Sequence, residues 1–301
     1  MSRNDHYAVV IGISDYSALG TIPLEGPQED VSRLVAWLTA PTGGDLPTEN
    51  VMSFAPGSIF SSDRSMEERR GRPDGNDIDT LFTPLYEKGQ EARVGERLYI
   101  MAAGHGISDC IDLHSVALLT ADAVPENPLH VALVKRAEWF RRHAAFDEIV
   151  LLAECCRDVL GYELTLPDWP ERWSHGRAHP RASKVRYLYG FAVGYGKQTR
   201  ERDFDGTGMR GIFTETVLRA LAEALPDAMG RWIDNRIVER LWRSLKCECV
   251  YIHAFETGTE ARKDIGAWID YYNTERPHSA LGGRTPGEAY DGLPMQIKQA
   301  A

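Results

Sequence analysis

The chain alternates between unbroken apolar runs and longer segments in which apolar residues recur every three or four positions. Three apolar runs, at 7–13, 98–103 and 149–153, are nearly continuous, as expected for strands buried on both faces of a parallel sheet. A fourth run, at 185–192, predicts a further strand.

The longer segments have the period of amphipathic helices and lie between or after the strands. We predict helices at 27–38, 77–88, 131–143 and 212–225. Strands that alternate with helices imply βαβ units joined in parallel. The sequence therefore predicts an α/β domain in which a mostly parallel sheet lies between two layers of helices.

The composition changes near Pro226. The residues after position 228 contain equal numbers of basic and acidic side chains, so the net charge of −10 belongs to the residues before them. Their pattern predicts two helices, at 234–248 and 259–273, followed by a Pro/Gly-rich end. We therefore divide the chain into a body, 1–226, and a helical appendage, 227–301.

Composition argues against several classes of protein. No segment reaches the ~18 apolar residues of a membrane span, and the N-terminus lacks the apolar stretch of a secretion signal. We therefore expect a cytoplasmic protein with no membrane partner. The five cysteines are an odd number that suits a reducing compartment. Cys247 and Cys249 lack the second pair of ligands that a structural zinc site needs, so neither a metal nor another cofactor is expected.

Two reactive side chains follow two of the apolar runs. His105, between two glycines, follows the run at 98–103, and Cys156 follows the run at 149–153. Each alone has an ordinary interpretation, a loop histidine and a small buried thiol. Because the carboxyl ends of neighbouring parallel strands meet at one edge of a sheet, the two together predict a site with imidazole and thiol side by side.

Four stretches of the body carry a family resemblance. In chain order they are 8–16, 26–30, Gly104-His105-Gly106 and Glu154-Cys155-Cys156-Arg157. They resemble the caspase and metacaspase-like clan of cysteine peptidases, in which a histidine precedes the Cys-Arg pair by about 50 residues. The resemblance covers about residues 7–225. It implies the caspase-like three-layer sandwich.

The same resemblance implies a cysteine endopeptidase with a Cys-His dyad. Cys156, directly before Arg157, corresponds to the nucleophile, His105 to the general acid–base, and Cys155 to a neighbour only. The backbone N–H groups of Gly106 and Cys156 would form the oxyanion hole. A thiol with its ordinary pKa of ~8.5 is mostly protonated at neutral pH, so it gains from a nearby imidazolium.

Glu154 occupies the position that helps form the primary pocket for Arg or Lys in metacaspase-like members. The acidic body also favours cationic substrates, so we expect a protein or peptide substrate cleaved after a basic residue. The alternative is that Glu154 is a hydrogen-bonded carboxylate at a strand end. The basic loop 161–184 lies where caspases are processed, and it is either cut at Arg172, Arg177 or Arg181 or is a solvated loop.

The appendage carries a second motif, in the stretches 230–235, 239–246 and 271–286. It resembles the end of an insertion-sequence transposase with a retroviral-integrase-like core, over residues 230–292. Glu239 corresponds to the last acid of that family's three-carboxylate metal site. Two-metal chemistry needs several converging carboxylates, and the strands for the other two are absent, so we expect a catalytically inert tail.

Two other functions stay open. One is a catalytically silent caspase-like scaffold or interaction protein. The other is DNA binding through the tail, which its zero net charge disfavours. The sequence leaves calcium activation, a regulatory protein partner and the oligomeric state undetermined.

Overall fold

The computed structural model describes residues 3–55, 71–110, 112, 114–159, 178–223, 258–277 and 283–291. The chain divides into two compact units, Met1–Ala222 and Glu223–Ala301. Among the described residues, no helix has both the length and the apolar character needed to cross a membrane.

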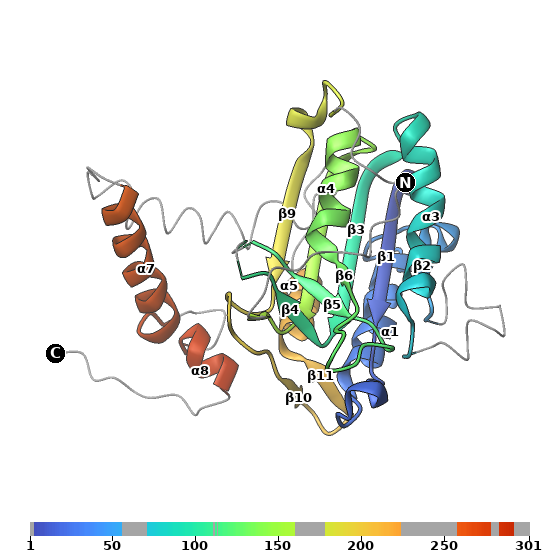
Figure 1. The fold of residues 1–301 in the computed structure, drawn as a ribbon. Helices are drawn as coiled ribbons and strands as arrows, with labels where there is room; N and C mark the ends of the chain where they lie inside the picture. The colour runs from blue at the N-terminus through green and yellow to red at the C-terminus, as the bar shows by residue number, and fades with distance from the viewer. Residues whose placement is uncertain are drawn as a thin grey trace. The chain divides into compact units, whose positions relative to one another are not determined.

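A parallel five-stranded sheet forms the centre of the first unit (Figure 1). Its strand order is β2-β1-β3-β7-β9, and every neighbouring pair is parallel. The inner strands are almost completely buried, which explains why the sequence shows them as unbroken apolar runs. The strands are β1 (His6–Gly12), β2 (Val51–Ser53), β3 (Gly95–Gly104), β7 (Phe146–Cys155) and β9 (Arg186–Phe191).

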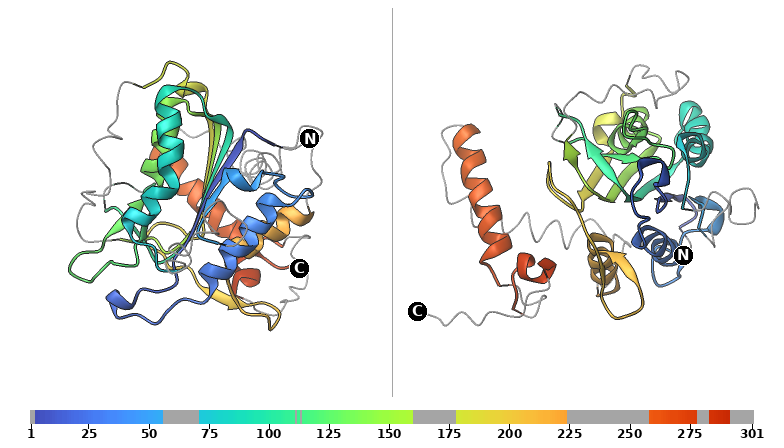
Figure 2. Two further views of the ribbon diagram at one scale, coloured as in Figure 1. Left: turned by 90° about the vertical axis from the view of Figure 1, so that its right-hand side faces the viewer. Right: turned by 60° about the horizontal axis from the view of Figure 1, so that its bottom comes forward.

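Helices cover both faces of this sheet (Figure 2). Two lie on one face, α3 (Gly75–Glu91) and α4 (Leu133–His143), and two on the other, α1 (Gly26–Thr39) and α5 (Ile212–Glu223). Each buries one apolar stripe against the sheet, as the sequence periodicity requires. The predicted α/β class, with a mostly parallel sheet, helices on both faces and a helical appendage, is confirmed.

Short strands outside the central sheet complete the architecture of the first unit. A second sheet has the order β6-β5-β4-β8, and an antiparallel hairpin spans residues 201–211. The second sheet contains β4 (Gly106–Ser108), β5 (Ala117–Leu119), β6 (His130–Ala132) and β8 (Asp158–Val159). The hairpin consists of β10 (Glu201–Asp203) and β11 (Met209–Gly211). Short 3-10 turns are η1 (Ser17–Leu19), η2 (Thr48–Asn50) and η4 (Ala182–Lys184).

The second unit contains α7 (Gly258–Thr274) and α8 (Pro286–Asp291), and α7 coincides with the second predicted tail helix. A capping box begins α8, because Thr285 and Glu288 exchange backbone-to-side-chain hydrogen bonds of 2.9 and 3.1 Å. The first predicted tail helix, with Glu239, lies outside the described residues, as do Cys247, Cys249, Arg172 and Arg177. Arg181 is described, and it forms an ion pair with Asp147 at 2.8 Å.

Candidate active site

Strands β3 and β7 deliver His105 and Cys156 to the same place. In the central sheet Gly104 pairs with Cys155, and in the second sheet Ile107 pairs with Asp158. Both strands therefore leave the first sheet and enter the second side by side, without a change of register. His105 and Cys156 occupy matching positions at this crossing.

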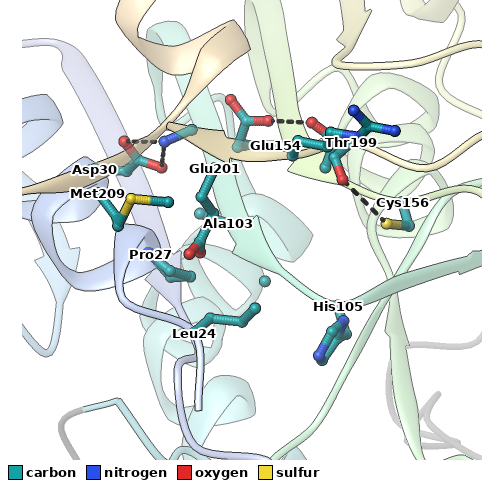
Figure 3. A pocket seen from close by; sticks show the side chains of 13 residues that line it. Leu24, Pro27, Asp30, Ala103, His105, Glu154, Cys156, Thr199, Glu201 and Met209 are labelled. Carbon is teal, nitrogen blue, oxygen red and sulfur yellow. Dashed lines mark hydrogen bonds between the residues drawn. The ribbon is translucent and has the colours of Figure 1, made fainter. Parts of the chain in front are cut away.

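The two side chains line one cavity of about 370 Å³. Figure 3 shows Cys156 and His105 toward one end of the cavity and Asp30 and Met209 toward the other. Segments far apart in sequence build its wall: the start of α1, the ends of β3 and β7, and the hairpin with the residues before it. The lining residues are Leu24, Pro27, Asp30, Ala103, Gly104, His105, Glu154, Cys156, Thr199, Arg200, Glu201, Met209 and Gly211.

The two adjacent cysteines have different environments. Cys155 is 1% exposed and packs inside the sheet, whereas Cys156 is partly exposed and faces the cavity. A Cβ at Gly106 would lie 2.6 Å from the sulfur of Cys155 and 2.4 Å from the carbonyl oxygen of Cys156. Glycine is therefore required at 106 because the strand that follows His105 passes directly against the cysteine pair.

The thiol and the imidazole are not hydrogen-bonded to each other in the described part of the chain. The Cys156 thiol instead donates to the carbonyl oxygen of Thr199 at 4.0 Å. The His105 ring lies 4.7 Å, centroid to centroid, from the ring of Tyr16. Its Nε2 is buried and has no hydrogen-bond partner among the described residues. The imidazole that lines the cavity therefore has one nitrogen that is unpartnered within the described ranges.

The charge states of the two groups differ from the thiolate and imidazolium that the sequence analysis considered. Burial raises the pKa of the Cys156 thiol, although the hydrogen bond to Thr199 lowers it in part. Burial lowers the pKa of His105, and the charge of Asp158 opposes this shift. Both groups are therefore neutral near pH 7 in the unliganded cavity. Such a pair needs the imidazole to remove the thiol proton during attack.

Three carboxylates line the cavity, and the sequence interpretation had singled out one of them. Glu154 is 6% exposed and accepts hydrogen bonds from the Thr199 hydroxyl at 2.9 Å and the Thr214 N–H at 2.7 Å. Asp30 is 1% exposed, and both of its oxygens accept from the Gly211 N–H, at 3.1 and 3.0 Å. Gly211 lies between these two acids, since a Cβ there would be 2.5 Å from the Glu154 carboxylate.

Glu201 is the third carboxylate, and it joins the hairpin to α1. Its oxygens accept from the N–H groups of Gly26, at 3.1 Å, and Glu25, at 3.3 Å. These N–H groups lie at the start of α1, where the helix dipole favours negative charge. The start of the helix therefore holds this carboxylate at the cavity wall.

The sequence reasoning missed Asp30 and Glu201 as site residues. Asp30 could have been found, because it lies on the stripe of α1 that also carries Val31 and Leu34 and is therefore a carboxylate on a buried face. Glu201 gives no such signal. Its position depends on a hairpin that the Gly-rich sequence does not specify.

The pKa values of the two most buried acids are raised, and Asp30 holds its proton at neutral pH when the cavity is empty. Burial, with the charges of Glu154 and Glu201, raises the pKa of Asp30 to about 8. Burial also raises the pKa of Glu154, and its hydrogen bonds offset part of the effect. A cation that enters the cavity reverses this balance by favouring the ionised carboxylates.

A separate group of metal-ligating side chains lies at the opposite ends of the strands. Among the described residues, Asp5, His6 and Glu96 place one ligand atom each within 4.8 Å of one another. Burial and the charge of Arg97 lower the pKa of His6 to about 4, so its imidazole is neutral. The nearby charges of Arg97 and Arg3 oppose a cation at this position.

The C-terminal part of the chain is similar to insertion-sequence transposases. Residues 226–286 match the integrase core domain family. The chain is 37% identical over 59 residues to the putative transposase InsK of element IS150 from Escherichia coli, which covers 20% of this chain and 21% of that protein. It is 33% identical over 75 residues to the transposase of IS904 from Lactococcus lactis, with 25% and 30% covered. The transposase resemblance inferred from the tail motifs is confirmed.

The chain spans less than a third of the length of these two curated relatives. Its backbone superposes on the crystal structure of caspase-1 from Spodoptera frugiperda with a TM-score of 0.49 and 12% sequence identity. The superposition covers 85% of this chain and 82% of that one. A Geobacter sulfurreducens protein superposes with a TM-score of 0.40 and 12% identity, over 72% of this chain and 82% of that one. Both superpositions have low scores, so the chemistry of the site depends on its own residues.

Proposed function

We propose that the first unit is a cysteine endopeptidase that cleaves after Arg or Lys through Cys156 and His105. One observation carries the proposal: a single cavity contains a partly exposed thiol, an imidazole with an unpartnered nitrogen, and three carboxylates. The first two groups suit nucleophilic attack on a carbonyl. The carboxylates suit the cationic side chain of the residue that precedes the cleaved bond.

The reaction begins with two neutral groups. His105 takes the thiol proton as the sulfur of Cys156 bonds to the substrate carbonyl carbon, and the carbonyl electron pair moves to the oxygen. The imidazolium then gives its proton to the leaving nitrogen as the C–N bond breaks, which leaves a thioester. Water attacks the thioester with His105 as base, the acid product leaves, and the thiol recovers its proton.

The N–H groups of Gly106 and Cys156 are the proposed donors to the oxyanion. Support comes from the close approach of the two segments, which leaves no space for a side chain at position 106. Donors held in place by β4 and by the end of β7 need no reorganisation as charge develops on the oxygen. Each such donor is typically worth ~3 kcal/mol in other hydrolases.

Turnover of fluorogenic peptides tests the proposal. Peptides that end in Arg should be hydrolysed faster than matched peptides that end in Asp, and Cys156→Ala should remove the activity. Cys110→Ala is the matched control, because Cys110 is an exposed thiol that does not line the cavity. Equal hydrolysis of both peptides would contradict the basic specificity, and activity that survives Cys156→Ala would contradict the nucleophile.

A catalytically silent scaffold is the second candidate. It is favoured by the hydrogen bond that directs the Cys156 thiol to Thr199 rather than to His105. In either case we propose that the transposase-like tail is inert, because a single acid cannot form a two-metal site. Mg²⁺-dependent strand transfer by the purified chain would contradict this.

A further inference from the structure

Tyr16 is a buried polar residue that the proposed mechanism does not use. It follows β1 in the chain and is completely buried. Its ring lies against the imidazole of His105, with centroids 4.7 Å apart and planes inclined by 60°. Burial raises the pKa of Tyr16, so the group stays a phenol that both donates and accepts a hydrogen bond.

Three hydrogen bonds form a closed ring around the His105 backbone. The His105 N–H donates to the Tyr16 hydroxyl at 2.9 Å, and this hydroxyl donates to the carbonyl oxygen of Leu119 at 3.3 Å. The Leu119 N–H in turn donates to the carbonyl oxygen of His105 at 2.9 Å. Both backbone polar groups of His105 are thus fixed, and each bond strengthens the next.

The chain before His105 is shaped around the same hydroxyl. Gly104 has a φ of 151°, and a Cβ there would lie 2.3 Å from the Tyr16 oxygen. This bend is where the chain leaves β3 and enters β4. The phenol therefore fills the space that a side chain would occupy and supplies a partner for an N–H group at the crossing.

We propose that Tyr16 is a positioning residue, which holds the His105 imidazole in the cavity through the backbone ring of hydrogen bonds and the contact between the two rings. The expected effect on turnover rests on the proposed function, whereas the effect on the position of the imidazole does not. If Tyr16 served only to fill the core, its ring alone would matter, and phenylalanine could replace it without loss of activity.

The test compares Tyr16→Phe with Tyr86→Phe in the full-length chain. Tyr86 is also completely buried but belongs to α3, away from the cavity. For an Arg-ending fluorogenic peptide, Tyr16→Phe should lower kcat about tenfold and leave KM within about twofold, because it removes both hydrogen bonds of the Tyr16 hydroxyl. Tyr86→Phe should leave both constants within about twofold.

Two NMR measurements make the result independent of peptidase activity. The Cε1–H resonance of His105 should shift and broaden in Tyr16→Phe and stay unchanged in Tyr86→Phe. In the unmodified chain, the amide proton of His105 should exchange slowly with solvent because Tyr16 accepts it. An unchanged imidazole resonance in Tyr16→Phe, or fast exchange of the His105 amide, would overturn the inference. An inactive chain in which both NMR results hold would overturn the peptidase proposal alone.

Discussion

His105 and Cys156 occupy matching positions in two adjacent segments that connect the central sheet with the second sheet. The pairing of Gly104 with Cys155 before the crossing and of Ile107 with Asp158 after it has the same register. A one-residue slip between these strands would turn one of the two side chains to the other face. The matching positions of the two residues are therefore set by the strand pairing before and after them.

Thr199 connects the reactive thiol with the acidic end of the cavity. Its carbonyl oxygen accepts from Cys156, and its hydroxyl donates to Glu154. In Thr199→Val, the Glu154 carboxylate loses one donor to its ionised form, so it binds a cation less well. We expect KM for an Arg-ending peptide to rise several-fold with a smaller change in kcat, and Thr199→Ser, which retains a hydroxyl, to recover most of the affinity. Equal KM values in both variants would show that this hydrogen bond does not contribute to binding.

Substrate affinity should depend on pH through Asp30. Its raised pKa of about 8 means that the empty cavity holds an uncharged Asp30 carboxyl below that pH and a carboxylate above it. Burial raises this pKa most and the charges of Glu154 and Glu201 raise it further, while the N–H of Gly211 and the charge of Arg33 lower it. KM for an Arg-ending peptide should therefore fall as pH rises from 6 through 8.

The control for this prediction is Asp30→Asn. The amide oxygen can still accept from Gly211, so the wall keeps its shape, but no charge appears with rising pH. Its KM should be higher at pH 9 and should vary less between pH 6 and 9. The same pH dependence in Asp30→Asn as in the unmodified chain would assign the titration to another group.

The pH profile of kcat/KM should be that of an imidazole and a thiol that are both uncharged near pH 7. Activity rises with pH as His105 loses its proton, and burial lowers the pKa of that imidazole below its ordinary value of 6.5. At alkaline pH the thiol ionises late, because burial raises the pKa of Cys156 above its ordinary value. An uncharged ester substrate separates this profile from the titration of Asp30. A rise in activity centred above pH 7, rather than below 6.5, would contradict a lowered His105 pKa.

Much of this arrangement can be predicted from the sequence. The apolar runs before His105 and Cys156 are buried on both faces, so their identity as parallel strands follows from composition alone. Their two reactive residues then line one cavity because parallel strands end at one edge. The hairpin that carries Glu201 could not be predicted, since its polar, Gly-rich sequence has no period of two. Thr199 was missed for a related reason, because its carbonyl and hydroxyl gain partners only from residues distant in sequence.

Stability of the first unit should depend on Glu215, which joins three elements. This carboxylate is 3% exposed and pairs with Arg33 of α1, with Arg219 at 2.5 Å and with Arg210 of β11 at 3.4 Å. Its removal in Glu215→Ala takes away the carboxylate that Arg33, Arg219 and Arg210 share, although Arg210 keeps its closer partner Asp205 at 2.6 Å. We expect a loss of about 2–3 kcal/mol in the free energy of unfolding.

Chemical denaturation followed by circular dichroism measures this loss. Glu138→Ala is a suitable control, because its pair with Arg141 is more exposed, with both side chains at 29%. It should cost less than about 1 kcal/mol. Equal costs for the two substitutions would mean that the buried network contributes no more than a surface ion pair.

Covalent labelling by a peptidyl chloromethyl ketone that ends in Arg tests the central claim most directly. Intact and peptide mass spectrometry should show one adduct, at Cys156 rather than at Cys155 or Cys110. Labelling should be slower with a matched chloromethyl ketone that ends in Asp. It should be strongly reduced in His105→Ala and absent in Cys156→Ala. An adduct that forms at the same rate with both reagents, or at the same rate without His105, would show only simple thiol reactivity and would contradict the dyad.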